Sequence, residues 1–424
     1  MTLPDENSRH CLEMGYPRSN ALQQLTLFMI KRIKIRDFKS IRELDMDLDP
    51  VTVIVGRSGT GKSNTVQALR FLRNCVLGGQ DNAVNYELGW GQIVPEGEKR
   101  PKTSIEVTFR LPGESKDYVY AISFGCVGSS QFPNQLILRS ESLSLGGETI
   151  FSRSCDDGSR WTWQKAPEIA NPPLIEPGPI INKLPSLQTV AFAYAGLSTG
   201  IGYYHFPAST LTNLALADPR SQFLQTVPGL WDNANNYLSM MRSITQDFHH
   251  PNIRKSLLAS LKAVNPSLAS IELDSLTSPN KAIVSHNAAG GIFALDLQQE
   301  SDGFRRFYAH LLALYQNPSK LTLIFEEPEN AIYPGALSLL ADEFKAAPSE
   351  NRGQVIITTH NPTLLDSFNV DDVRVVEMRD GKTVIGHVSK EQTASVKDQL
   401  LTTGDLLKID QPRLDDLELA KQTL

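Results

Sequence analysis

Apolar and polar residues follow two distinct periodicities along the chain, and these predict its main elements. The segment MIKRIKIRDFKSI, from Met29, alternates with period two, which is typical of a half-buried strand. The run VTVIV at 51–55 is continuously apolar and suits a central parallel strand. Four apolar residues then recur at helical spacing: Val66, Leu69, Leu72 and Val76. The order strand, glycine-rich loop, helix is therefore expected here.

The pattern changes in the middle of the chain. Short alternating runs broken by Gly, Pro, Ser and Asp predict an antiparallel β subdomain over 104–165. A proline-rich connection and helical patterns then predict a helical insertion over 166–289. Parallel-sheet signals return in LTLIF and QVIITTH. The predicted core is thus split between 29–103 and 290–424, and 1–28 is expected to be a flexible N-terminal extension.

Composition narrows the class of protein. The chain has 424 residues, 41% of them hydrophobic, and a formal net charge of -6, which is ordinary for a globular protein. Its longest apolar runs are too short to span a membrane, and its start lacks a signal-peptide pattern, so a soluble cytoplasmic protein without membrane association is expected. Four widely spaced cysteines are expected to be reduced structural thiols: Cys11, Cys75, Cys126 and Cys155.

The loop after the first apolar strand carries the clearest chemistry. Its sequence fits GxxxxGK[ST], in which glycines let backbone N–H groups wrap phosphates at a helix N-terminus. Lys62 is expected to meet the β- and γ-phosphates, and the Ser63 hydroxyl to ligate Mg²⁺. The loop predicts ATP or GTP binding through these residues: Gly56, Ser58, Gly59, Thr60, Gly61, Lys62, Ser63 and Asn64.

Two further motifs supply candidates for hydrolysis. The apolar strand in LTLIFEEPEN ends in Glu326 and Glu327, so one carboxylate can hold the Mg²⁺ water shell while the other polarises the attacking water. The alternative is a strand running into a solvated acidic turn. His360, in IITTHNP, ends another strand and is a candidate to hydrogen-bond the γ-phosphate. The alternative is an ordinary residue at a strand end.

A fourth motif, QESDGFRRFYAHLLALY, predicts a helix with an N-terminal cap. Ser301 and Gly303 precede or begin a strongly periodic apolar helix, whose start suits an anion. Alone, the motif indicates only a helix start.

Taken in order, the motifs FKSI, GKSN, SDGFRRF, EEPEN and TTHNP resemble the ABC-type ATPases of the SMC and RecF kind, most closely the stand-alone AAA-like ATPases related to the OLD family. The resemblance covers about 30–110 and 290–385. It implies an α/β P-loop NTPase fold of ABC or RecF head type that uses ATP and Mg²⁺.

The resemblance also implies a homodimer or higher homo-oligomer with composite ATP sites, in which Ser301 and Gly303 close on a γ-phosphate held by the partner. Relatives sense Mg²⁺ and γ-phosphate with a glutamine after the first helix, and Gln92 is the best candidate by position, an ordinary loop glutamine being the alternative. This sequence departs from many relatives in having Glu300 before the serine and Glu326 in place of aspartate.

The resemblance leaves the effector open. OLD nucleases carry a C-terminal Toprim domain, but about sixty residues follow His360, and VRVVEMRDGKTVIGHV among them reads as a closing hairpin. A separately encoded effector, a nuclease or a toxin, is therefore expected beside this chain.

Three classes of function are weighed. The first is an ATP-hydrolysing dimeric switch in bacterial anti-phage defence or DNA maintenance, and the second is a nucleotide-dependent scaffold or sensor with little or no turnover. A transporter subunit is disfavoured because its signature normally reads LSGGQ, and a GTPase because NKLP lacks the aspartate of NKxD.

Two remaining features have a structural and a functional interpretation. Phe38 is expected in the core, with contact to adenine as the alternative. Six cations suit the solvated outer face of an edge strand, with a nucleic-acid surface as the alternative: Lys31, Arg32, Lys34, Arg36, Lys39 and Arg42.

Overall fold

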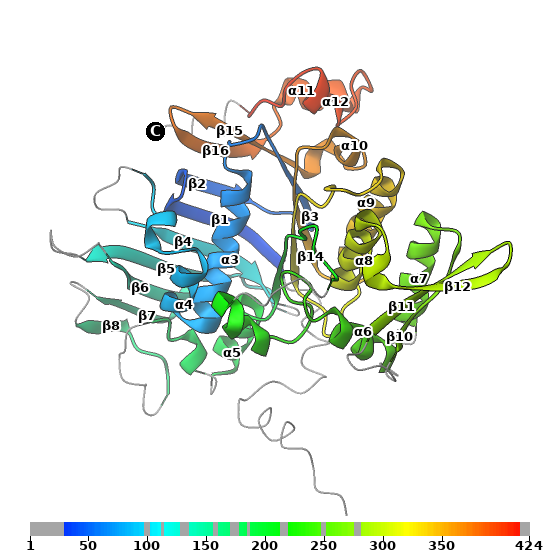
Figure 1. The fold of residues 1–424 in the computed structure, drawn as a ribbon. Helices are drawn as coiled ribbons and strands as arrows, with labels where there is room; N and C mark the ends of the chain where they lie inside the picture. The colour runs from blue at the N-terminus through cyan, green and yellow to red at the C-terminus, as the bar shows by residue number, and fades with distance from the viewer. Residues whose placement is uncertain are drawn as a thin grey trace, which may run out of the picture.

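The computed structural model describes residues 29–96, 102–111, 114–127, 135–155, 160–169, 178–184, 187–212, 219–246, 252–274 and 281–415. The predicted extension over 1–28 lies outside the described residues. Three β-sheets form the framework, with helices packed between and around them (Figure 1). The α/β fold class expected from the sequence is confirmed.

A six-stranded sheet forms the centre of the fold, in the order β16-β15-β3-β14-β13-β9. Its strands are β3 (Val51–Val55), β9 (Ile201–Tyr204), β13 (Thr322–Glu326), β14 (Gln354–Thr359), β15 (Val373–Arg379) and β16 (Lys382–His387). Neighbouring strands are parallel, except that β15 and β16 form the antiparallel hairpin expected near the end of the chain. The strands β3, β13 and β14 are buried on both faces, which explains their continuous apolar runs.

A seven-stranded antiparallel sheet packs against this centre, in the order β2-β1-β4-β5-β6-β7-β8. Its strands are β1 (Met29–Phe38), β2 (Ile41–Asp47), β4 (Ser104–Arg110), β5 (Tyr118–Val127), β6 (Gln135–Leu145), β7 (Glu148–Cys155) and β8 (Trp161–Lys165). The region 104–165 supplies five of these strands. The first two strands of the chain join the same sheet rather than the parallel one.

The position of β1 corrects one expectation. It lies between β2 and β4, so it is an interior strand and not an edge strand. Its outward cations form ion pairs with the neighbouring strands: Arg32 Nε lies 2.5 Å from Asp45, and Lys34 Nζ lies 2.8 Å from Glu106. These half-exposed pairs are ordinary cross-strand contacts of a solvated sheet face.

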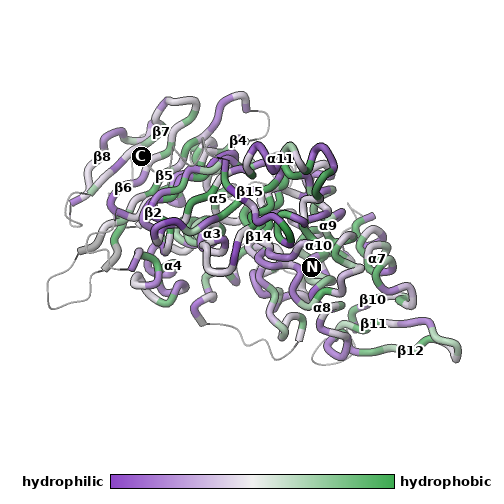
Figure 2. The backbone as a smooth tube through the Cα atoms, turned by 90° about the horizontal axis from the view of Figure 1, so that it is seen from above, coloured by the Kyte–Doolittle hydropathy of each residue, from purple (hydrophilic) through white to green (hydrophobic). Residues whose placement is uncertain are grey.

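Helices cover both faces of the central sheet. On one face, α3 (Lys62–Gly78) lies between the two large sheets and packs against Ile54 of β3. On the other face, α8 (Asp302–Leu314) and α9 (Pro334–Ser349) pack against Val53 and its neighbours. Successive residues of β3 therefore pack into two separate hydrophobic cores on opposite faces of the sheet. Figure 2 shows hydrophobic positions gathered around β14 and its flanking helices.

The remaining helices are no longer than α8. They are α4 (Gln80–Tyr86), α5 (Gln188–Leu197), α6 (Tyr237–Gln246), α7 (Asn252–Val264), α10 (Pro362–Leu365), α11 (Lys390–Lys397) and α12 (Asp405–Lys408), with 3₁₀ turns η2 (Trp90–Gln92), η3 (Ile181–Lys183), η4 (Pro219–Thr226), η5 (Leu297–Gln299) and η6 (Val370–Asp372). No helix in the described part of the chain is long and apolar enough to cross a membrane. Cys75 and Cys155 are buried thiols, and neither forms a disulfide within the described part of the chain.

The insertion over 166–289 contains more β-structure than its helical pattern predicts. It supplies β9, a four-residue buried strand with no alternation to reveal it. It also supplies most of a small antiparallel sheet formed by β10 (Leu268–Asp274), β11 (Lys281–Ala288) and β12 (Gly291–Asp296). The β11–β12 hairpin projects from the body of the molecule in Figure 1. This sheet crosses the expected boundary at 289, and β12 leads through η5 into α8.

Candidate nucleotide-binding and hydrolysis site

The glycines of the phosphate loop are required by its backbone. Gly59 and Gly61 have φ values of 80° and 103°, where a side chain is strained. A Cβ at Gly61 would lie 2.3 Å from Thr383 Oγ1, and one at Gly56 would lie 2.3 Å from the Val376 carbonyl oxygen. Thr383 and Val376 belong to the β15–β16 hairpin, which therefore supports the loop from outside.

The Lys62 ammonium lies inside the loop. Its Nζ donates hydrogen bonds to the Gly56 carbonyl at 2.7 Å and the Arg57 carbonyl at 2.9 Å. Burial lowers the pKa of Lys62, while the charges of Glu327 and Glu329 act in the opposite direction. A cation at the start of a 17-residue helix, inside a glycine-rich loop, suits the phosphates of a nucleotide.

The other loop residues divide into exposed and anchored ones. Ser58 and Gly59 are exposed, and Ser63 is partly exposed on the first turn of α3. The Thr60 hydroxyl donates to the Arg57 carbonyl at 2.8 Å. Asn64 Nδ2 donates to Ser40 Oγ at 2.8 Å, so this side chain ties the loop to the β1–β2 turn.

The paired carboxylates lie at the end of β13, two strands from the phosphate loop. The strand β14 separates β13 from β3, so the two strands are not direct neighbours. Parallel strands nevertheless bring their carboxyl ends to one edge of the sheet. The Glu326 carboxylate accepts a hydrogen bond from the Tyr203 hydroxyl. Burial raises the pKa of Tyr203 well above its ordinary value, so its hydroxyl stays a donor.

Glu327 has an unusual backbone conformation. Its φ of 46° lies in the left-handed region, which costs a non-glycine residue about 1 kcal/mol or more. Its N–H donates to the Thr358 carbonyl at 2.9 Å, and Asn330 Nδ2 donates to its Oε2 at 3.1 Å. These bonds hold the strained turn and direct the carboxylate.

His360 lies between two carboxylates. Its Nδ1 is 3.3 Å from Glu327 Oε1 and 3.5 Å from Glu329 Oε1, and about half of its side chain is exposed. Glu329 is buried and accepts hydrogen bonds from Thr359 Oγ1 at 2.7 Å and the His360 N–H at 3.2 Å. Burial raises the pKa of Glu329, and these hydrogen bonds oppose the rise.

The signature motif, SDGFRRF from Ser301, lies against the residues that follow the carboxylates. Ser301 Oγ accepts a hydrogen bond from the Phe304 N–H at 3.3 Å and so caps α8. A Cβ on Gly303 would lie 2.6 Å from the Ala331 carbonyl oxygen, so only glycine allows this close approach. Glu300, where many relatives have leucine, bonds His286 Nε2 of β11 at 2.7 Å.

Two predicted residues lie elsewhere. Gln92 is exposed in η2. The carbonyl oxygen of the next residue, Ile93, accepts a hydrogen bond from the Lys39 N–H at 2.6 Å, which ties η2 to the β1–β2 turn. Its sensing role stays a prediction. Phe38 is fully buried, with its ring 5.7 Å from that of Phe71, so it belongs to the core.

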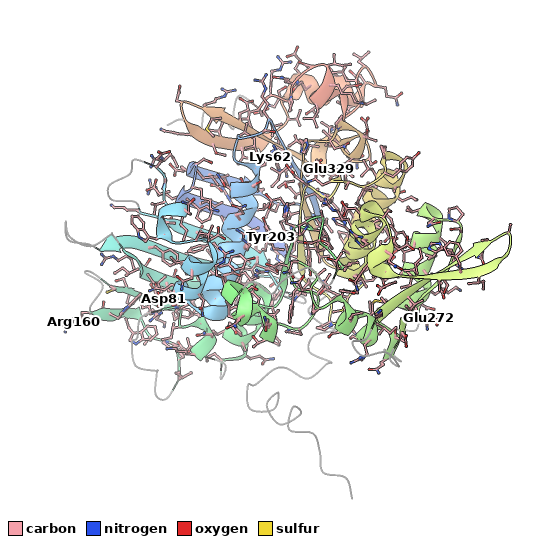
Figure 3. All side chains as sticks on the ribbon, in the orientation of Figure 1. Lys62, Asp81, Arg160, Tyr203, Glu272 and Glu329 are labelled. Atoms are coloured by element: carbon pink, nitrogen blue, oxygen red, sulfur yellow. The ribbon has the colours of Figure 1, made fainter. Side chains whose placement is uncertain are left out.

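Two residues of the site were not predicted from the sequence. Glu329 stands in the EEPEN motif as a third acid, and its burial beside His360 is a tertiary contact. Tyr203 comes from the insertion, in a strand without a distinctive pattern. Figure 3 labels both of them and Lys62 in the central part of the molecule.

The oxygen donors at this edge fit Mg²⁺. The Ser63 hydroxyl and the Glu326 carboxylate are hard ligands, and Mg²⁺ is usually held by one or two such protein groups together with substrate phosphates. The loop around Lys62 fits those phosphates, because it combines a cation with the N–H groups at the start of α3.

The sheet order and the placement of these motifs define a P-loop ATPase head of the ABC type. The Smc head domain from Pyrococcus furiosus, solved with an extended coiled coil and bound to the C-terminal domain of ScpA, has the same fold: its TM-score is 0.51 at 13% identity, over 88% of this chain and 100% of that chain. The chain belongs to the family described as AAA domain, putative AbiEii toxin, Type IV TA system, whose model matches residues 51–366.

Two further solved structures are similar over most of the chain. An Smc head bound to the C-winged helix domain of ScpA has a TM-score of 0.49 at 14% identity, over 86% of this chain and 99% of that chain. The SMC head domain from Thermotoga maritima has a TM-score of 0.42 at 14% identity, over 85% and 99%.

Proposed function

We propose that this chain binds ATP with Mg²⁺, hydrolyses it, and works as a dimeric switch. The observation that carries the proposal is the pair of carboxylates around one imidazole. His360 Nδ1 faces both Glu327 and Glu329, and both carboxylates influence the charge of Lys62. A phosphate-binding cation and a candidate general base therefore lie close enough to interact.

Each residue has a distinct role in the proposed hydrolysis. Lys62 holds the β- and γ-phosphates. Glu327 accepts the proton of a water whose oxygen attacks the γ-phosphorus as the bond to the bridging oxygen breaks. The Nδ1 of His360 faces the carboxylates, so its Nε2 is left to hydrogen-bond the γ-phosphate. Mg²⁺, held by Ser63 and Glu326, neutralises phosphate charge when bound.

The proposal of a dimer is based on the N-terminal end of α8. Ser301 is exposed, and the helix that it caps has thirteen residues, with N–H groups and a positive dipole end suited to an anion. We assign Ser301 and Gly303 to the γ-phosphate held by a partner copy. The proposal keeps Gln92 of η2 as the candidate sensor of Mg²⁺ and γ-phosphate.

The family description bears on the proposed biological setting. The description as a putative toxin of a type IV toxin–antitoxin system supports anti-phage defence over DNA maintenance. The Pyrococcus furiosus Smc head bound to a ScpA domain supports docking of a separately encoded protein on a head of this fold. The effector of this chain is then a nuclease or a toxin. Three cations of β1 form ion pairs with acidic side chains, so they do not support a nucleic-acid surface on this strand.

A single-turnover assay tests hydrolysis directly. Excess protein is mixed with radiolabelled ATP and Mg²⁺, and the release of phosphate is followed for the natural protein and for Lys62→Ala. Release by the natural protein and loss of ATP binding in Lys62→Ala are expected, since the variant lacks the buried cation. Tight ATP binding without phosphate release would instead favour the sensor with little or no turnover.

A further inference from the structure

Tyr203 reaches the proposed metal site from the insertion. It lies on β9, which pairs in parallel with β13 and places Tyr203 opposite Ile324. Alternate residues of a strand share a face, so Glu326 lies on the same face of β13 as Ile324. That face packs against α3. The buried Tyr203 hydroxyl donates a hydrogen bond to Glu326 Oε2.

Tyr203 is itself held from α3. The Gln67 side chain lies close enough to the Tyr203 hydroxyl to act against the rise of its pKa, and Lys39 Nζ donates to Gln67 Oε1 at 2.6 Å. The Arg70 guanidinium lies 4.6 Å from the centre of the tyrosine ring. Gln67 is one helical turn after Ser63, so the contacts of Tyr203 join both proposed sides of the Mg²⁺ site.

The length of Glu326 explains why such a contact is useful. A glutamate has one more rotatable bond than the aspartate common at this position in relatives, so its carboxylate is less fixed by the backbone. A hydrogen bond from a rigid, buried phenol restricts that freedom. It occupies Oε2 and leaves the other oxygen available toward the metal.

We propose that Tyr203 is a positioning residue that fixes the Glu326 carboxylate for Mg²⁺ bound with the nucleotide. This inference rests on the proposed function only for the role of Glu326 in metal binding, and it does not need hydrolysis. Tyr203 acts through Glu326, so its effect must disappear when Glu326 cannot serve the metal.

The test measures Mg²⁺ dependence of nucleotide binding. A fluorescent N-methylanthraniloyl ATP is bound to the natural protein and to Tyr203→Phe while Mg²⁺ is varied, with excess EDTA as the metal-free reference. Tyr203→Phe is expected to raise the Mg²⁺ concentration for half-maximal binding about tenfold, the effect of one hydrogen bond to a charged group. Affinity in EDTA should stay the same.

Matched variants separate positioning from a structural effect. Tyr204→Phe makes the same change one residue away, where the hydroxyl bonds Gln316 at 2.7 Å, and should leave the Mg²⁺ dependence unchanged. In a Glu326→Gln background, Tyr203→Phe should raise the Mg²⁺ concentration for half-maximal binding by less than twofold. If Tyr203→Phe unfolds, Gln67→Met, which removes the support of the hydroxyl, should give a smaller shift in the same direction.

Several results would overturn the inference. One is an unchanged Mg²⁺ midpoint in Tyr203→Phe, or in Gln67→Met if only that variant folds. Another is an equal shift of the midpoint by Tyr203→Phe in the natural protein and in the Glu326→Gln background. A third is a natural protein whose nucleotide affinity does not depend on Mg²⁺. A natural protein that binds ATP with Mg²⁺ but releases no phosphate would refute the proposed hydrolysis and leave this test intact.

Discussion

At the scale of single residues, the site contains local features that cost stability. Glu327 adopts a left-handed backbone, and Glu329 is a buried carboxylate whose Oε2 has no hydrogen-bond partner among the described residues. Such features persist only where the surrounding structure holds them, and they concentrate at functional sites. Bonds from Asn330 and Thr359 supply that support here.

Glu327→Gln tests the general base. The amide keeps the shape of the side chain but cannot accept a proton, so phosphate release should slow by at least about a hundredfold while ATP binding remains. Single-turnover kinetics measure the first effect and nucleotide titration the second. Glu350→Gln, an exposed acid at the end of α9, is the control and should hydrolyse ATP normally. Normal turnover in Glu327→Gln would move the base role to another residue, with Glu326 the first to examine.

At the scale of elements, α8 connects the signature motif to the carboxylates. Its first turn approaches the Ala331 carbonyl oxygen through Gly303, and Arg306 Nη1 donates to the Asn330 carbonyl at 3.1 Å. Its middle is fixed by His310, whose ring packs among Phe206, Phe325 and Phe344. A displacement of this helix therefore reaches the loop that holds Glu327.

Gly303→Ala tests the close approach of α8. The new methyl group would lie 2.6 Å from a backbone oxygen, so the helix start has to move. We expect hydrolysis to fall at least about tenfold and unfolding stability to fall by about 1–3 kcal/mol. Gly290→Ala, where nothing lies within 4 Å, is the control. Equal stability and activity in the two variants would show that α8 tolerates the methyl group.

His310 predicts a pH dependence of stability. Burial lowers the pKa of His310 to about 3, below its ordinary value of 6.5. The neutral ring therefore contributes its full stability above pH 6.5, and this is lost as pH falls from 6.5 toward 3, by about 1.4 kcal/mol per pH unit. Denaturant unfolding at pH 7.5 and 5.5 should show a steeper loss in the natural protein than in His310→Phe. An exposed-site variant, His205→Asn, should keep the natural slope.

At the scale of the whole molecule, the central sheet separates two cores. One contains α3, α5 and the seven-stranded antiparallel sheet, and the other contains α6, α7, α8 and α9. The phosphate loop therefore begins a helix on one face of the sheet, and the signature begins a helix on the other. Under the proposed function, two copies complete each other's sites across this arrangement.

Complementation tests the shared sites. Lys62→Ala and Ser301→Arg should each be inactive, the first from loss of the phosphate-binding cation and the second from a blocked signature. In a mixed dimer both lesions can fall on one composite site, so mixing the proteins should restore part of the ATPase activity. A Ser301→Arg variant that hydrolyses ATP normally as a verified monomer would refute the assignment of Ser301 to the nucleotide of the partner copy. Phosphate release and sedimentation measure the two properties.

The sequence by itself determined the elements whose signals are local. The phosphate loop is contiguous, and its glycines, Lys62 and Ser63 are recognised by spacing. The runs at 51–55 and 321–325 are apolar because both faces of their strands are buried. The acids and histidine that end β13 and β14 were therefore predictable as candidates, since parallel strands bring such ends to one edge.

The tertiary structure decided everything that depends on pairing between distant segments. Only the sheet order places β1 beside β4 and β14 between β3 and β13, because alternation reports a buried face and not its neighbour. Tyr203 meets Glu326 across 123 residues of sequence, and Glu329 meets Thr359 across 30. Such contacts leave no periodic trace in either segment, so their chemistry became visible only when the chain was folded.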